Sequence, residues 1–163
     1  MILSIVLGCM MVAFVTVYHF GKMPKKQHEK IYSTMTTAEL IKLMQSMHCE
    51  LVRKIDDDSF VIGFQGGYFQ ILRDNSGQSI QMFYKDFYAC SYEQSKKIVF
   101  DVNGINRQYT AWSCYLRKRH EDGESEKPFS VCLSTYLFLS GSETQLKKQL
   151  RLLLEAAFII ARS

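Results

Sequence analysis

The chain is poor in the residues that interrupt or loosen a fold. It has two prolines and nine glycines among 163 residues. This composition excludes collagen-like, proline-rich and intrinsically disordered classes. The hydrophobic fraction is 47% and the aromatic fraction 13%, which indicates a packed core in a chain of about one ordinary domain.

Metal-binding spacings are also absent. The histidines form no HxH or HExxH arrangement, and the cysteines form no CxxC. His48 and Cys49 are the only adjacent pair of candidate ligands, and neighbours at a helix end point in different directions, so we interpret the pair as incidental. The run Asp56, Asp57 and Asp58 lacks the alternating ligands and the downstream glutamate of a calcium loop. We therefore expect no metal and no cofactor.

Catalytic motifs are missing as well. There is no GxSxG element, and no serine or cysteine stands next to a base in a known pattern. Residues 63–67, GFQGG, lack the Lys-Ser/Thr ending of a phosphate loop and join two expected strands, which favours a hairpin turn. Asp86 and Asp101 could form a carboxylate pair only if the fold brought them together. The sequence predicts no enzyme and no catalytic residues; an enzyme with a site outside known motifs is the alternative.

The net charge of +4 comes from one short segment. Residues 31–163 hold 16 basic and 15 acidic side chains, so the body is nearly neutral. Nucleic-acid binding, which depends on neutralising phosphates, loses its electrostatic support. The lysines that carry the excess follow directly after an apolar start: Lys22, Lys25, Lys26 and Lys30.

The cysteines predict free thiols. Their odd number argues against a disulfide framework, and two of them, Cys114 and Cys132, lie in apolar stretches where a thiol behaves as a small hydrophobe. This pattern favours a reducing compartment. The full set is Cys9, Cys49, Cys90, Cys114 and Cys132.

The first residues predict a membrane anchor. Residues 2–20 contain no Lys, Arg, Asp or Glu, and a helix of this length reaches roughly 30 Å, the thickness of a hydrocarbon core. We expect a transmembrane anchor over residues 1–21 and a basic linker over residues 22–35. Because the lysines follow the span, the positive-inside rule predicts a single-pass protein of the inner (cytoplasmic) membrane whose domain faces the cytoplasm.

Two other interpretations of this segment are weaker. A cleavable signal peptide needs a basic start and a small-residue cleavage site, and neither is present. Residues 6–9, VLGC, resemble a lipoprotein processing box, but the apolar run continues past them. A surface role, in which the four lysines bind anionic lipid, is a further alternative for the whole protein.

The body, residues 36–163, alternates between helical and strand periods. Thr36 and Glu39 form a capping box before a helix expected over residues 37–48. Strict alternation then predicts about four antiparallel strands from Leu51 to Tyr84, separated by turns rich in Asp, Gly, Asn and Ser. Ser91 caps a second helix with Ile98, Val102 and Ile105 on one face, ended by residues 102–106, VNGIN.

Two longer strands are expected over residues 110–117 and 129–139. Ser142 then caps a last helix with an apolar stripe formed by Leu146, Leu150, Leu153 and Ala157, joined by Leu154 and Phe158. The expected fold is α+β: an antiparallel sheet of about six strands with helices in the order αββββαββα, preceded by one transmembrane helix.

This order, the VNGIN segment with Asn103 and Asn106, and the two strands and leucine-rich helix after it resemble the YbjN family, whose members are assigned to bacterial sensory transduction. The resemblance covers roughly residues 36–160. It implies the fold of type III secretion chaperones, an adaptor-like or chaperone-like role, and dimers such as those chaperones often form. It carries over no catalytic residue. For the two asparagines, a structural role at a helix end is favoured over contact with a partner.

Aromatic side chains are dense in the strand region, and a sheet with one covered face cannot bury them all. We expect most to be core and some to line a partner site. The function predicted is a membrane-anchored, non-enzymatic module that binds a protein or peptide by strand addition or by a helix in a groove, as a homodimer. The aromatics are Phe60, Phe64, Tyr68, Phe69, Phe83, Tyr84, Phe87 and Tyr88.

Overall fold

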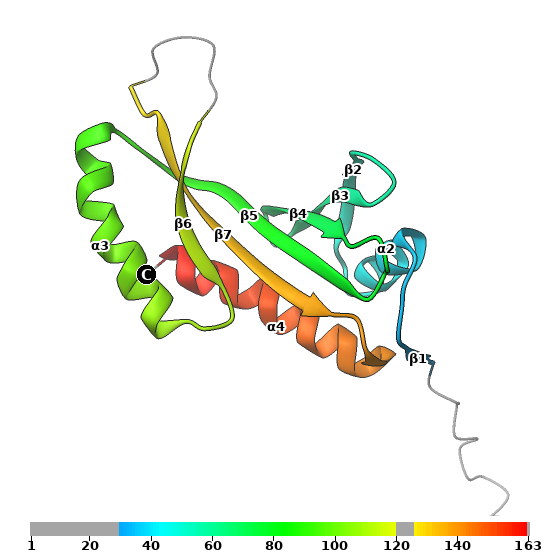
Figure 1. The fold of residues 1–163 in the computed structure, drawn as a ribbon. Coiled ribbons are helices and arrows are strands. Elements are labelled where there is room, and N and C mark those ends of the chain that lie inside the picture. Colours follow the sequence, from blue (N-terminus) through cyan, green and yellow to red (C-terminus); the bar gives the residue numbers. More distant parts are fainter. Residues whose placement is uncertain (1–29, 120–125, 163) are drawn as a thin grey trace, which may run out of the picture.

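The computed structural model describes residues 30–119 and 126–162 (Figure 1). Apart from the two-residue strands β1 and β8, its elements follow the predicted order αββββαββα. In chain order they are β1 (Ile31–Tyr32), α2 (Thr37–Gln45), β2 (Glu50–Lys54), β3 (Ser59–Phe64), β4 (Gly67–Arg73), β5 (Ser79–Cys90), α3 (Tyr92–Gln108), β6 (Ser113–Lys118), β7 (Phe129–Phe138), β8 (Gly141–Ser142) and α4 (Glu143–Arg162).

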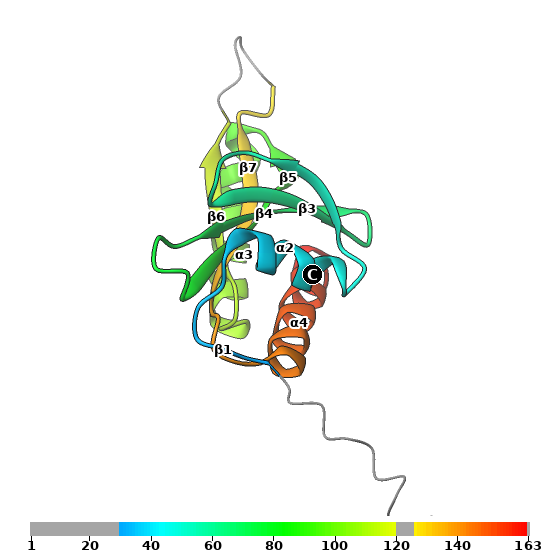
Figure 2. The same ribbon diagram turned by 90° about the vertical axis from the view of Figure 1, so that its right-hand side faces the viewer.

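Six strands form one antiparallel sheet in the order β2-β3-β4-β5-β7-β6, which confirms the predicted α+β class. Figure 2 shows α2 and α4 below β3 and β4, and side chains on the other face of the sheet, such as Tyr68 and Leu72 of β4, are exposed. Helix α3 packs against β6. The sheet therefore has one face covered by helices and one face left open.

The three helices begin where capping residues predicted. The Thr36 hydroxyl accepts from the Glu39 N–H, and the Ser91 hydroxyl accepts from the Gln94 N–H. Ser142 does the same for α4, where its hydroxyl accepts from the backbone N–H of Gln145 at 3.3 Å. Each cap bonds a backbone donor that has no partner inside the helix.

Helix α4 supplies much of the core beneath the sheet. Leu146, Leu150, Leu154, Ala157 and Ile160 are buried along one stripe. The phenyl ring of Phe158 lies edge-on against Phe69 at 5.7 Å between centroids. Leu153 was expected in the buried stripe, but it is only partly buried, because Leu154 takes the position facing the core.

Helix α3 continues beyond the segment expected to end it. Residues 102–106 are helical, and the last residue of α3 is Gln108. Gly104 lies in the helix interior without a positive φ, so it does not act as a terminator. The next strand, expected from residue 110, begins at Ser113 instead.

The turns lie where their sequences predicted. Asp56, Asp57 and Asp58 form the β2–β3 turn, where the Asp58 N–H donates to the Asp56 carboxylate at 2.9 Å. Gln65 and Gly66, at φ 48° and 83°, connect β3 to β4 in the left-handed conformations that tight hairpins require. The glycine-rich segment is therefore a hairpin.

The folded body begins a few residues before Thr36. Strand β1 pairs with β8, and Met35 is buried, so the end of the expected linker is part of the packed structure. The expected transmembrane anchor, residues 1–21, lies outside the described residues. Within the described ranges, no helix is long and apolar enough to span a bilayer.

Candidate binding surface

The uncovered side of the sheet carries a set of apolar side chains, which we call the open face. Strand register places Leu72, Gln81 and Tyr136 in one row across β4, β5 and β7, and side chains of directly opposed residues share a face. Tyr136 and Phe138 are 68% and 73% exposed. The apolar members of the open face are Tyr68, Leu72, Phe83, Tyr136 and Phe138.

Polar side chains separate these apolar groups. Lys85 Nζ donates to the Gln70 side-chain oxygen and lies 5.1 Å from the centroid of the Phe83 ring. Gln70 in turn donates to the Ser59 hydroxyl at 3.2 Å. The open face is thus amphipathic, with aromatic groups set among polar side chains such as Gln70, Ser59 and Lys85.

Asp86 lies in β5 and forms hydrogen bonds with side chains of β6 and β7. It sits at φ 55° in the irregular part of β5 between Tyr84 and Tyr88. Its carboxylate accepts from Arg117 Nη2 at 2.7 and 2.9 Å and from the Ser130 hydroxyl. Burial acts to raise the pKa of Asp86, but the hydrogen bonds from Ser130 and Arg117 outweigh it and lower that pKa.

This cluster is not arranged for catalysis. A carboxylate whose pKa is lowered by an arginine is a weak base at neutral pH. Cys132 Sγ lies 3.9 Å from the Asp86 carboxylate, and no described histidine joins the group. Asp101 lines a different groove, on α3, so the structure does not pair the two aspartates. The contacts of Asp86 instead hold β5, β6 and β7 together at the bulge.

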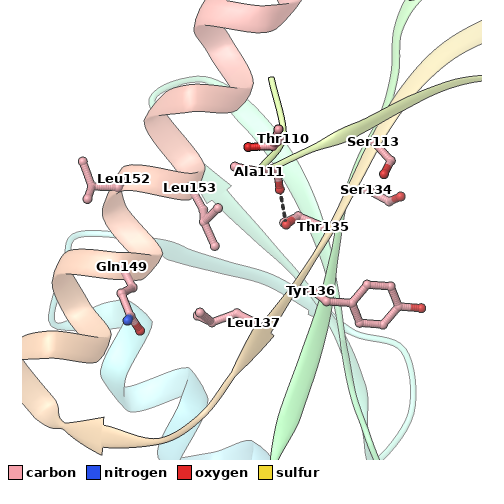
Figure 3. Close-up of a pocket in the computed structure, with 10 residues that line it drawn as sticks. All are labelled: Thr110, Ala111, Ser113, Ser134, Thr135, Tyr136, Leu137, Gln149, Leu152 and Leu153. Carbon is pink, nitrogen blue, oxygen red and sulfur yellow. Dashed lines mark hydrogen bonds between the residues drawn. The ribbon is translucent and has the colours of Figure 1, made fainter. Parts of the chain in front are cut away.

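A cavity of about 570 Å³ lies where β7 faces α4 beyond the start of β6 (Figure 3). We call it the β7–α4 cavity. The hydroxyl of Thr135 donates to the carbonyl of Ala111 at its end, and none of its lining residues is Asp, Glu, His, Lys, Arg or Cys. It is lined by Thr110, Ala111, Ser113, Ser134, Thr135, Tyr136, Leu137, Gln149, Leu152 and Leu153.

A second groove, of about 540 Å³, runs along α3. Its wall is mostly apolar and includes Phe87, Tyr88 and Phe100, while Asp101 is its one carboxylate. Neither hollow brings together the several ionisable groups that acid–base or nucleophilic chemistry needs. The walls of both hollows are suited to binding apolar side chains.

His48 and Cys49 follow α2 directly. His48 has a left-handed φ of 65°, and the Cys49 N–H donates to the Met44 carbonyl at 3.1 Å, which closes the helix end. Burial raises the pKa of the Cys49 thiol to about 11, which disfavours the thiolate that binds metals. Among the described residues, no three His, Cys, Asp or Glu side chains form a cluster that could hold a metal ion.

Most of the predicted aromatic set is core. Phe60, Phe64 and Phe69 are buried, and Tyr84 and Phe87 pack against them. Tyr68 and Tyr88 are exposed. Tyr136 and Phe138 were not predicted as surface residues, although alternation along residues 129–139 places them on the face opposite Leu133 and Leu137.

Comparison of the sequence with protein-family models and with curated proteins gives no match. A solved structure is similar, described as "Crystal structure of YbjN, a putative transcription regulator from E. coli". The two chains share 10% sequence identity and superpose with a TM-score of 0.61, over 81% of this chain and 92% of that chain. At this identity the likeness shows the fold alone. The chain therefore has a YbjN-like fold.

Proposed function

We propose that the protein is a non-enzymatic module that binds a segment of another protein or a peptide on its open face. The observation that carries this proposal is the exposure of Tyr68, Tyr136 and Phe138 on one face of the sheet, while the other face packs against the helices. Aromatic side chains left in water next to amides and hydroxyls are typical of partner surfaces. The similar structure, YbjN, is described as a regulator, which agrees with a binding role.

The β7–α4 cavity and the α3 groove favour binding over catalysis. An enzyme of this size needs a pocket in which a base, an acid or a nucleophile converges on one point. The β7–α4 cavity has no such group, and the α3 groove has Asp101 alone. Asp86, the most elaborately bonded carboxylate, is neutralised by Arg117.

The proposal includes attachment to the inner membrane. Residues 1–21 form the single-pass anchor, the basic linker follows from residue 22 to the start of the folded body, and the domain faces the cytoplasm, where a homodimer binds its partner. The support is the uncharged run followed by lysines. A tether of this kind holds the open face near the membrane without using any of its surface.

Site-specific photocrosslinking in cells tests the proposed surface. Benzoylphenylalanine is introduced in place of Tyr68 or Tyr136, and in place of Tyr92 as a control. Tyr92 is an exposed tyrosine on α3, outside the open face. We expect discrete crosslinked products from positions 68 and 136 and none from position 92. Equal products at all three positions, or none at any, would count against the open face as a binding surface.

A further inference from the structure

Strand β7 extends past its neighbour β6. Their pairing ends at Ser113 and Ser134, whereas β7 continues to Phe138 beside β5. The chain before β6 turns away because the Trp112 indole N–H donates to the Leu153 carbonyl on α4 at 3.0 Å. Residues 136–138 consequently have β5 on one side and, among the described strands, none on the other.

The direction of the backbone groups in this segment follows from its pairing with β5. The Leu139 N–H donates to the Gln78 carbonyl at 2.7 Å, on the β5 side. Backbone groups alternate between the two sides of a strand, so those of Leu137 also face β5. The N–H and C=O groups of Tyr136 and Phe138 then point away from β5, toward the unpaired edge of β7. There they offer two donors and two acceptors.

This free edge borders the β7–α4 cavity. In Figure 3 the Leu137 side chain points toward α4 and Leu153 points toward it, whereas Leu152 projects from the other side of α4 in this view; all three are lining residues of the cavity. The Tyr136 ring points to the other side of β7. A strand laid along the edge would thus place alternate side chains in the cavity and on the open face.

The other free edges of the sheet are protected. Strand β2 carries Arg53 and Lys54 and has an irregular register. On β6, the backbone of Cys114 is occupied by the Asn106 side chain. Charges, bulges and covering groups are the usual means of preventing strand addition at an edge. Residues 136–138, Tyr-Leu-Phe, have none of these.

Helix α4 carries a positive charge four residues before Leu152, which lines the cavity. On α4, Lys147 pairs with Glu143 and Arg151 pairs with Glu155. Lys148 is exposed one turn before Leu152, and no carboxylate within the described ranges pairs with it. A ligand that passes Lys148 gains from an acidic side chain.

We infer that an extended peptide adds to β7 at residues 136–138 as a further strand, antiparallel to β7 and in line with β6. One apolar side chain of the peptide enters the β7–α4 cavity against Leu137 and Leu153. An acidic side chain lies near Lys148. This inference rests on the proposed function and specifies its ligand: an extended segment with alternating apolar residues and a negative charge.

The test uses the full-length chain, purified in detergent, on an array of synthetic heptapeptides. The peptides carry Val, Ile, Leu or Phe at alternate positions, with Glu, Ser or Lys between them. We expect binding to the Glu set over the Lys set. Methylation of the backbone nitrogens that face β7 should weaken binding about tenfold or more, because each methyl removes a donor and blocks pairing.

Matched variants locate the site. Leu152→Glu should abolish binding, whereas Ile159→Glu, the same change at a similarly exposed position of α4, should leave it unchanged; the two residues are 56% and 61% exposed. Phe138→Pro removes a backbone donor on the unpaired edge of β7 without breaking the hydrogen bonds between β5 and β7. It should also abolish binding. Lys148→Glu should reverse the preference between the Glu and Lys sets.

Several outcomes would overturn strand addition. Binding that survives Leu152→Glu and backbone methylation, while photocrosslinking at positions 68 and 136 persists, would leave the proposed function standing and remove this mode. Absence of both binding and crosslinking would remove both. A dimer, seen by sedimentation, that Phe138→Pro dissociates, with no peptide bound, would assign the edge to a second copy of the chain instead.

Discussion

The side-chain amide of Asn106 bonds both backbone groups of Cys114. Its oxygen accepts from the Cys114 N–H at 2.6 Å, and its nitrogen donates to the Cys114 carbonyl at 2.9 Å. Because β6 is an edge strand, this amide from α3 occupies the positions that a further strand would use. The contact gives Asn106 a structural role, and it leaves the uncovered end of β7 as the accessible part of this side of the sheet.

Replacing Asn106 should therefore destabilise the domain. Asn106→Ala leaves a backbone donor and acceptor of the buried Cys114 without partners, which we expect to cost about 1 to 3 kcal/mol in the free energy of unfolding. Asn103→Ala is the matched control, because Asn103 is exposed on the same helix, and its effect should stay within about 0.5 kcal/mol. Urea unfolding measures both, and equal losses would contradict the structural role.

Two glycines should respond in opposite directions to alanine. A Cβ at Gly67 would lie 2.7 Å from ring atoms of Phe158, so Gly67→Ala should destabilise by about 1 to 3 kcal/mol. Gly104 has nothing within 4 Å of its Cβ position and lies inside α3, so Gly104→Ala should stabilise by roughly 0.5 to 1 kcal/mol. Thermal unfolding of both variants checks the signs.

Protonation of Glu39 at low pH should destabilise the N-terminus of α2. The hydrogen bond from Lys30, with others from the Thr36 N–H and hydroxyl, lowers the pKa of Glu39 from 4.5 to about 2. Because the folded pKa is the lower one, this stabilisation is complete above about pH 4.5 and is lost as the pH falls toward 2. Unfolding measured across this window should show a shallower pH dependence in Glu39→Gln. An NMR titration that places Glu39 at its ordinary pKa would contradict the account.

A reporter fused to the C-terminus tests the proposed attachment. The lysines after residue 20 predict that the domain stays in the cytoplasm, so a reporter that works only there should be active. Glutamine in place of Lys22, Lys25, Lys26 and Lys30 should lower the fraction of molecules whose domain faces the cytoplasm. Activity of a reporter that works only outside the cytoplasm would show that the topology is wrong.

The sequence was sufficient for the element order because local signals agreed with one another. Capping residues such as Thr36 and Ser91 fixed helix starts, and alternation along β3, β4 and β5 fixed the strands. Helix ends were less predictable. Asn and Gly in residues 102–106 suggested a stop, but packing of Val102 and Ile105 carries α3 on to Gln108.

The candidate site depended on contacts between distant parts of the chain. Residues 110–112 have the composition of a strand, but they do not pair with β7, and the Trp112 indole N–H donates to the Leu153 carbonyl on α4 instead. That separation creates both the cavity and the free edge. Likewise, the exposure of Tyr136 follows from which sheet face the helices cover, and periodicity alone does not decide this.

The most direct test of the binding role compares three tyrosine variants against the partner captured by crosslinking at position 136. The affinities of Tyr68→Ser, Tyr136→Ser and Tyr92→Ser are measured by titration calorimetry, together with their unfolding free energies. All three residues are exposed, and only the first two lie on the open face. We predict a loss of about tenfold or more for the first two, with stability changes within about 0.5 kcal/mol and no loss for the third. Unchanged affinity in the open-face variants, or an equal loss in Tyr92→Ser, would contradict the account.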